Sequence, residues 1–295
     1  MTVHTFHVQP IHNNDYYALA VTTPFSQAQI SLLGAQVISF SPKGAEEMLW
    51  ISQSLKKPPS PVRGGIPVCW PYFSREGQTE NVPFHGLARS VVWRLVEQRP
   101  TASQTILLEF VPPHFDHLPV QLRMQLEIGK TLKQSLITTN KGTSPYVLTQ
   151  ALHTYFKVAD VEKIYVTGVD KCPFLDKFQG AKETHIQQGN WTLNDAHNPG
   201  HSDRIYTKGG GIYDIVDPLM HRRIRIQTHG SEGLVIWNPG QEGAAKLDDI
   251  AHQWKEFVCV ETTNAGPDKI TVGPQQEHVL SHILSLEPLS TELSE

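Results

Sequence analysis

The sequence predicts an all-β fold, a sandwich or barrel of short strands, and two observations carry this prediction. Glycine and proline, with 21 residues each among 295, interrupt the chain often, and a helical repeat over three turns is hard to find. Short runs of β-branched and aromatic residues recur instead, separated by turn residues. No linker, low-complexity segment or repeat divides the chain, so we expect one domain over residues 1–295.

The expected strands follow one another along the whole chain. They are residues 18–22, 29–33, 37–40, 105–110, 120–128, 130–139, 147–152, 163–167, 222–227, 234–237, 257–261 and 278–286. Gly129 and Lys130, between two alternating runs, indicate a hairpin. Three stretches break the pattern: 45–50 could form a helical turn, 52–61 should be a surface loop, and 243–254 could form a short helix with Asp248 and Asp249 facing solvent.

The charge and cysteine content exclude several classes of protein. The formal net charge is -4 and no basic block occurs, which argues against nucleic acid as a partner. No run approaches ~20 apolar residues, and the N-terminus lacks the pattern of a secretory signal. The three cysteines are far apart and odd in number, which favours a reducing cytoplasm over a disulfide framework. We expect a cytoplasmic protein that does not bind a membrane.

The segment 150–156, Gln-Ala-Leu-His-Thr-Tyr-Phe, places a titratable imidazole in a strand. Alternation puts His153 and Tyr155 on one face, and Thr154 and Phe156 on the other. A histidine of this kind is most often a core residue with backbone partners. Three other stretches that carry ionisable groups, 62–73, 83–89 and 257–268, favour a functional role.

Two of these stretches supply arginines beside glycines. Arg63 precedes Gly64-Gly65, and His85 and Arg89 flank Gly86 in PFHGLAR. A guanidinium offers planar donors that suit sugar hydroxyls, carboxylates or phosphate oxygens. The ordinary alternative is a surface arginine and a capping histidine in plain loops. The first stretch is not a phosphate loop of the strand–helix kind, because GxxxxGK[ST] is absent.

Two carboxylates complete the set of candidates. Glu261 ends an apolar strand, where a charge is disfavoured unless it is paired or functional. Asp203, in DRIY, could accept hydrogen bonds from sugar hydroxyls. The alternatives are a strand end that points to water and a turn aspartate paired with Arg204. The sequence has 15 histidines but contains no CxxC, HExxH or EF-hand pattern, so no metal site is indicated.

Taken together and in order, the blocks RGGIPVCWPYF, PFHGLAR, LHTYF, DRIY, VIWNPG and FVCVETTNA resemble the aldose 1-epimerase superfamily. More narrowly, they resemble its glucose-6-phosphate 1-epimerase (hexose-6-phosphate mutarotase) branch. The resemblance implies a galactose-mutarotase-like β-supersandwich of two large, mostly antiparallel sheets. It also implies a cytoplasmic enzyme without metal or organic cofactor, and we expect a monomer.

Carried over position by position, the resemblance makes His153 the catalytic acid and Glu261 the catalytic base. The remaining matches are to substrate-binding positions: Arg63, Gln78, His85, Arg89 and Asp203. The implied reaction interconverts the α and β anomers of D-glucose 6-phosphate by opening and closing the ring. We expect the acid and the base on opposite sides of the C1–O5 bond, with a neighbouring carboxylate, Asp203 or Glu261, keeping His153 charged.

Three other functions compete with this one. An aldose 1-epimerase could act on unphosphorylated hexoses with the same acid and base. A carbohydrate-binding module would need aromatic and hydrogen-bonding groups but no catalytic pair. A glycosidase or lyase on a similar scaffold would use two carboxylates, whereas the pair here is histidine and glutamate.

Overall fold

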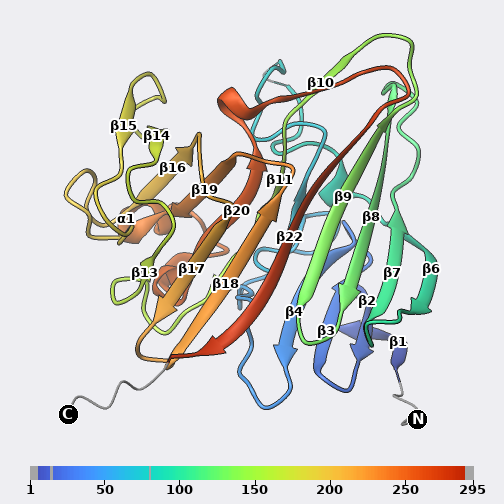
Figure 1. Cartoon of the computed structure of the whole chain (residues 1–295), viewed down its shortest axis with the longest axis horizontal. Coiled ribbons are helices and arrows are strands. Elements are labelled where there is room, and N and C mark those ends of the chain that lie inside the picture. Colours follow the sequence, from blue (N-terminus) through green and yellow to red (C-terminus); the bar gives the residue numbers. More distant parts are fainter. Residues whose placement is uncertain (1–5, 14–15, 80, 290–295) are drawn as a thin grey trace.

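The computed structural model describes residues 6–13, 16–79 and 81–289, which form strands in four sheets and only short helices (Figure 1). The all-β prediction and the two large antiparallel sheets are confirmed. Within the described ranges, no helix is long and apolar enough to cross a membrane.

The first eight-stranded sheet, called here the site sheet, carries the candidate residues. Its order is β15-β14-β16-β19-β20-β11-β5, and β12 also pairs with β20. The bounds are β5 (Val68–Cys69), β11 (Gln150–Leu152), β12 (Tyr155–Lys157), β14 (Pro173–Asp176), β15 (Thr184–Ile186), β16 (Ser202–Tyr206), β19 (Gly233–Asn238) and β20 (Phe257–Asn264).

The second eight-stranded sheet, called here the back sheet, has the order β13-β17-β18-β22-β9-β8-β7-β6. Its bounds are β6 (Arg94–Pro100), β7 (Ile106–Val111), β8 (Val120–Ile128), β9 (Leu132–Asn140), β13 (Tyr165–Val166), β17 (Ile212–Asp217), β18 (Arg222–His229) and β22 (Glu277–Pro288).

Two smaller sheets and four short helices complete the described structure. The elements are β1 (His7–Asn13), β2 (Tyr16–Thr22), β3 (Ser26–Ser31), β4 (Gln36–Pro42), β10 (Tyr146–Leu148) paired with β21 (Ile270–Val272), η1 (Ala88–Ser90), α1 (Gly240–Ala244), η2 (Ala251–Glu256) and η3 (Gly266–Asp268). The predicted hairpin at Gly129 and Lys130 is confirmed, because Ile128 pairs with Leu132.

The main core lies between the site sheet and the back sheet. Alternate residues of β8, such as Met124 and Leu126, point into it, as do Val258 and Val260 of β20. Each buried aliphatic side chain contributes about 1.5–3 kcal/mol to folding. All eight residues of β20 are buried, because the face opposite this core is also covered. The first four residues of β20 are apolar, and Glu261 is the one charged residue of this buried strand.

The two helical predictions were wrong in detail. Residues 45–50 form no helix, because Leu49 pairs with Phe156 and the Glu47 carboxylate accepts hydrogen bonds from the backbone N–H groups of Phe40 and Leu49. The stretch 243–254 divides between the ends of α1 and η2. Asp249, expected to face solvent, is buried and pairs with Arg63 at 3.0 Å. The loop 52–61 is largely exposed, as predicted.

Gly86 fixes the turn that carries His85 and lies beside the site sheet. Its φ is +83°, and an added Cβ would lie 2.1 Å from the carbonyl oxygen of Trp70. We expect Gly86→Ala to lower the free energy of unfolding by about 1–3 kcal/mol from backbone strain, and by more from the clash. Urea unfolding measures this. Gly77 has a φ of +71° but no atom near an added Cβ, so Gly77→Ala measures the backbone strain without a clash. Gly210 has neither a positive φ nor a close neighbour, so Gly210→Ala is the control. Equal losses in all three variants would contradict the steric argument.

Candidate active site

The candidate residues gather on the face of the site sheet opposite the main core. Strand register aligns Asp203 with Trp237, Trp237 with Cys259, and Cys259 with Tyr155, so one row crosses four strands. Glu261 stands two residues from Cys259 on the same face of β20. A cavity of about 350 Å³ opens above this row. Its lining is Arg63, Phe73, Phe84, His85, Arg89, His153, Tyr155, Lys177, Asp203, Trp237, Leu247 and Glu261.

His153 and Glu261 meet at the buried end of this cavity. Their side chains approach to 3.4 Å between Nε2 and Oε1, and the two residues are 8% and 1% exposed. The ring of His153 stacks on Tyr155 at 5.0 Å with an interplanar angle of 11°. Nδ1 of His153 and Oε2 of Glu261 are buried without a hydrogen-bond partner. Two titratable groups thus keep polar atoms free beside a cavity large enough for a small ligand.

His153 and Glu261 lie side by side and do not face one another across a ring. No sugar ring fits between atoms 3.4 Å apart. The exocyclic oxygen O1 and the ring oxygen O5 are both bonded to C1, so an adjacent acid and base can reach both oxygens from one side.

The two arginines differ in their partners. Nε of Arg63 donates to Asp249 at 3.0 Å, and Nη1 donates to the Tyr155 hydroxyl at 2.9 Å. Arg89 donates from Nη2 to the carbonyl of Phe84 and, among the described residues, forms no ion pair. Burial lowers the pKa of Arg89 from its ordinary value. Arg89 therefore brings an uncompensated positive charge to the cavity, which favours an anionic ligand.

His85 enters the cavity as a neutral ring. Its Nδ1 accepts a hydrogen bond from the backbone N–H of Ser74 at 3.1 Å, so the neutral tautomer carries its proton on Nε2. Burial, followed by the neighbouring imidazole of His153, lowers the pKa of His85 well below its ordinary value. Its ring contacts His153 edge-on at 5.4 Å. His85 can therefore donate a hydrogen bond but is not suited to supply a proton.

Burial and charge act in opposite directions on His153 and Glu261. Burial, followed by Arg89 and Arg63, lowers the pKa of His153 well below its ordinary value. Burial, followed by Asp203, raises the pKa of Glu261 well above its ordinary value. Both shifts favour the uncharged forms, a neutral imidazole and a protonated carboxyl group. The direction for His153 is opposite to the one expected from a neighbouring carboxylate, and burial is its largest cause.

The sequence matches the aldose 1-epimerase family over residues 17–285. The chain belongs to this family. A relative from Escherichia coli strain K12, provisionally named glucose-6-phosphate 1-epimerase, is 31% identical over 277 residues, which cover 90% of this chain and 89% of the relative. A relative from Cenchrus ciliaris with the same provisional name is 29% identical over 266 residues, which cover 85% of this chain and 78% of the relative. A crystal structure of a protein from Salmonella typhimurium, provisionally titled a mutarotase, superimposes with a TM-score of 0.85 at 27% sequence identity. The match covers 95% of this chain and 94% of that protein.

Family membership makes the chain an isomerase with aldose 1-epimerase, or mutarotase, activity. The galactose-mutarotase-like fold is confirmed by the same comparison. Six of the seven residues carried over from the sequence line the single cavity described above. Gln78 does not: it is exposed, and its backbone N–H bonds to the carbonyl of Arg75.

Sequence reasoning missed Lys177 of this epimerase. Lys177 follows β14, a four-residue strand that was not expected, and no local motif marks it. Its position depends on pairing between β14 and β16, which brings it next to Asp203. Tyr155 and Trp237 also line the cavity. Both lie inside blocks that carry the family resemblance, and alternation placed Tyr155 on the face of His153, but neither was named as a site residue.

A cluster of three possible metal ligands lies at the end of the epimerase cavity. His153, Cys259 and Glu261 offer atoms within 4.8 Å of one another. Burial, followed by Glu261, raises the pKa of Cys259 well above its ordinary value, and a protonated thiol is a poor ligand. The same cavity is lined by three positively charged side chains, which disfavour a metal cation: Arg63, Arg89 and Lys177.

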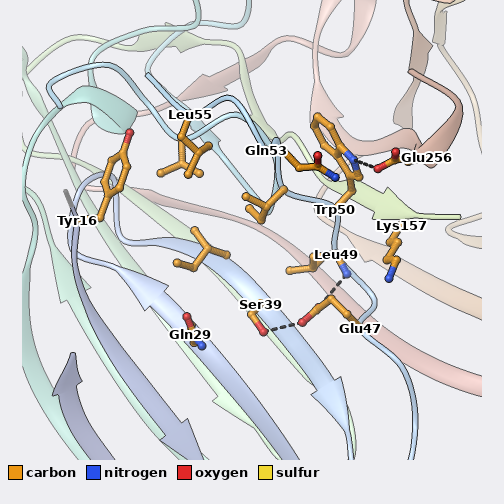
Figure 2. A pocket seen from close by; sticks show the side chains of 13 residues that line it. Tyr16, Gln29, Ser39, Glu47, Leu49, Trp50, Gln53, Leu55, Lys157 and Glu256 are labelled. Carbon is orange, nitrogen blue, oxygen red and sulfur yellow. Dashed lines mark hydrogen bonds between the residues drawn. The ribbon is translucent and has the colours of Figure 1, made fainter. Parts of the chain in front are cut away.

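A second cavity, of about 390 Å³, lies between β3, β4 and the segment 47–62 (Figure 2). Its two carboxylates are engaged: Glu47 accepts from Ser39 and Leu49, and Glu256 accepts from Nε1 of Trp50. No histidine lines it. It therefore lacks an acid–base pair, and its wall instead supports Trp50, which stacks on Tyr155 at 5.8 Å.

The proton shared by His153 and Glu261 predicts how stability depends on pH. In the unfolded chain, glutamate loses its proton near pH ~4.3 and histidine near pH ~6.5. Above the histidine range, near pH ~6.5, the difference between the two states comes from Glu261, whose raised pKa lets the folded chain keep a proton that the unfolded chain has lost. The free energy of unfolding should therefore fall as pH rises toward the raised pKa, by at most about 1.4 kcal/mol per pH unit.

Glu261→Gln should remove this fall, because the amide does not titrate. Urea unfolding of parent and variant between pH 6.5 and 8.5 measures it. Parallel pH profiles would show that Glu261 is already ionised in the folded protein.

Proposed function

We propose that this protein interconverts the α and β anomers of D-glucose 6-phosphate, with His153 as the acid and Glu261 as the base. The observation that carries the proposal is the 3.4 Å approach of the two side chains beside a cavity of about 350 Å³, with one polar atom of each left without a partner. The provisional names of the relatives in Escherichia coli and Cenchrus ciliaris support the phosphorylated substrate.

The reaction begins from the arrangement in which Glu261 is ionised and His153 is protonated. Glu261 takes the proton of the C1 hydroxyl while His153 delivers its proton to O5, the C1–O5 bond breaks, and C1 becomes an aldehyde carbon. Rotation about C1–C2 presents the other face of the carbonyl, and ring closure reverses both transfers. The pair holds one proton before and after ring opening, so no proton need be exchanged with solvent.

A bound phosphate would favour this starting arrangement. Arg89 and Arg63 are, after burial, the largest causes that lower the pKa of His153. A dianion beside these guanidinium groups would offset their charge and raise the pKa of the imidazole. Phosphate binding would therefore move the shared proton from Glu261 to His153, where the reaction needs it.

Arg89 is the better candidate for the phosphate. Arg63 is already held by Asp249 and Tyr155, whereas Arg89 has no carboxylate partner among the described residues. Charge-assisted hydrogen bonds from a guanidinium to phosphate are strong and frequently bidentate. Arg63 is better suited to orient Tyr155, on which the His153 ring stacks.

Magnetisation exchange between the anomers, measured by NMR on glucose 6-phosphate and on glucose, tests the proposal. We expect faster exchange than in buffer for both sugars, with the larger kcat/KM for the phosphorylated one. Equal values would favour an aldose 1-epimerase of neutral hexoses. Binding without any increase in exchange would make the protein a carbohydrate-binding module instead.

A further inference from the structure

Lys177 is held in the cavity by the backbone around it. Its N–H donates to the carbonyl of Asp203 at 2.9 Å, and the preceding residue, Asp176, accepts from the N–H of Phe178 at 2.9 Å. These bonds fix the start of the turn after β14. The ammonium group lies 3.7 Å from Asp203 Oδ2 and 5.3 Å from the centre of the Phe73 ring. Lys177 and Asp203 thus present a donor and an acceptor side by side, with side chains 28% and 20% exposed.

The charges around the acid and the base are distributed unequally. Arg89 and Arg63 are the largest charges that act on His153, with Lys177 the smallest, whereas Asp203 and then Lys177 are the charges that act on Glu261. Register agrees with this, because Asp203 lies on the β16–β19–β20 side of the site sheet, which carries Glu261. Arg63 instead bonds to Tyr155 on β12. The cavity therefore has an arginine side next to the acid and a Lys177–Asp203 side next to the base.

The chemistry of a pyranose assigns a part of the sugar to each side. With O5 at His153, the next ring atom is C5, which carries C6 and its phosphate, and these face the arginines. With O1 at Glu261, the neighbouring ring carbon is C2. The 2-hydroxyl group is therefore the substituent that faces Lys177 and Asp203.

We propose that Lys177, together with Asp203, recognises the 2-hydroxyl group of the sugar and is a specificity-determining residue of this enzyme. The hydroxyl donates to the Asp203 carboxylate and accepts from the Lys177 ammonium. This inference rests on the proposed acid and base roles, because they orient the ring. A hydroxyl can satisfy both groups at once, whereas a sugar with hydrogen at C2 leaves both charged groups without a sugar partner.

The test compares glucose 6-phosphate with 2-deoxyglucose 6-phosphate by anomer exchange in the parent, Lys177→Met and Lys182→Met. Hydrogen bonds to charged groups contribute about 1.5–3 kcal/mol, so the parent should favour glucose 6-phosphate by about 10-fold to 100-fold in kcat/KM. Lys177→Met should lower kcat/KM for glucose 6-phosphate about 10-fold and change the 2-deoxy sugar less than about 3-fold. Lys182 lies in the same turn, is exposed and does not line the cavity, so its variant is the control.

An equal loss on both sugars in Lys177→Met would overturn the proposal, since a structural or phosphate-binding role would not distinguish them. Lys177→Arg, which keeps a charged donor, should recover part of the preference. If Lys177→Met does not fold, the parent alone decides: equal kcat/KM for the two sugars contradicts recognition at C2. Failure of the parent to exchange glucose 6-phosphate at all would instead contradict the proposed function.

Discussion

Glu261→Gln should lower kcat for the exchange of glucose 6-phosphate anomers by about 10²-fold to 10⁴-fold, the usual contribution of a positioned general base. Glutamine has the size of glutamate and can accept a hydrogen bond, but it cannot take the proton of the C1 hydroxyl. KM should change little, because the sugar keeps its other contacts. NMR magnetisation exchange at saturating substrate measures kcat, and a titration of substrate gives KM.

A matched control separates the two cavities. Glu256→Gln changes a carboxylate of the second cavity, where an amide oxygen can still accept from Nε1 of Trp50. We expect this variant to retain activity. A loss as large as that of Glu261→Gln would contradict the assignment of catalysis to the cavity above β20. His153→Ala combined with Glu261→Gln should cost little more than either change alone, because the two residues act as a unit.

Arg89→Met should raise KM for glucose 6-phosphate by about 10-fold to 100-fold, because it removes charge-assisted bonds worth about 1.5–3 kcal/mol. Methionine retains much of the apolar stem and removes the charge. kcat/KM for unphosphorylated glucose should change much less. Exchange rates for the two sugars over a range of concentrations give this comparison.

Two other arginines provide the reference for this prediction. Arg63→Met should impair both sugars, since Arg63 bonds to Asp249 and to Tyr155, which stacks on His153. Arg94 is exposed and does not line the cavity, so Arg94→Met is a control that should change the rates for neither sugar. If Arg89→Met reduced turnover of glucose as much as that of glucose 6-phosphate, Arg89 would bind a part of the sugar common to both.

Alternation along short segments predicted much of the site correctly. The sequence around His153 indicated that Tyr155 shares its face, and both side chains line the cavity. Glu261 stood out because it is a charged residue that follows an apolar, buried run in its strand. These predictions rest on the two-residue period of a strand, which holds whatever the strand packs against.

Predictions that depended on distant partners were less accurate. Asp249 was expected in solvent, but it pairs with Arg63 across 186 residues of chain. A carboxylate was expected to keep His153 charged, but burial lowers its pKa. In both cases the outcome depends on what covers the group, and one sequence does not give that.

The sequence by itself determined the all-β class, the faces of the strands and the ordered blocks that indicate the family, because local periodicity and composition carry this information. Only the tertiary structure decided that His153 and Glu261 touch, that Arg89 lacks a carboxylate partner among the described residues, and that Lys177 stands beside Asp203. Strand register across the site sheet brings these residues together, and register is set by packing between segments far apart in the chain.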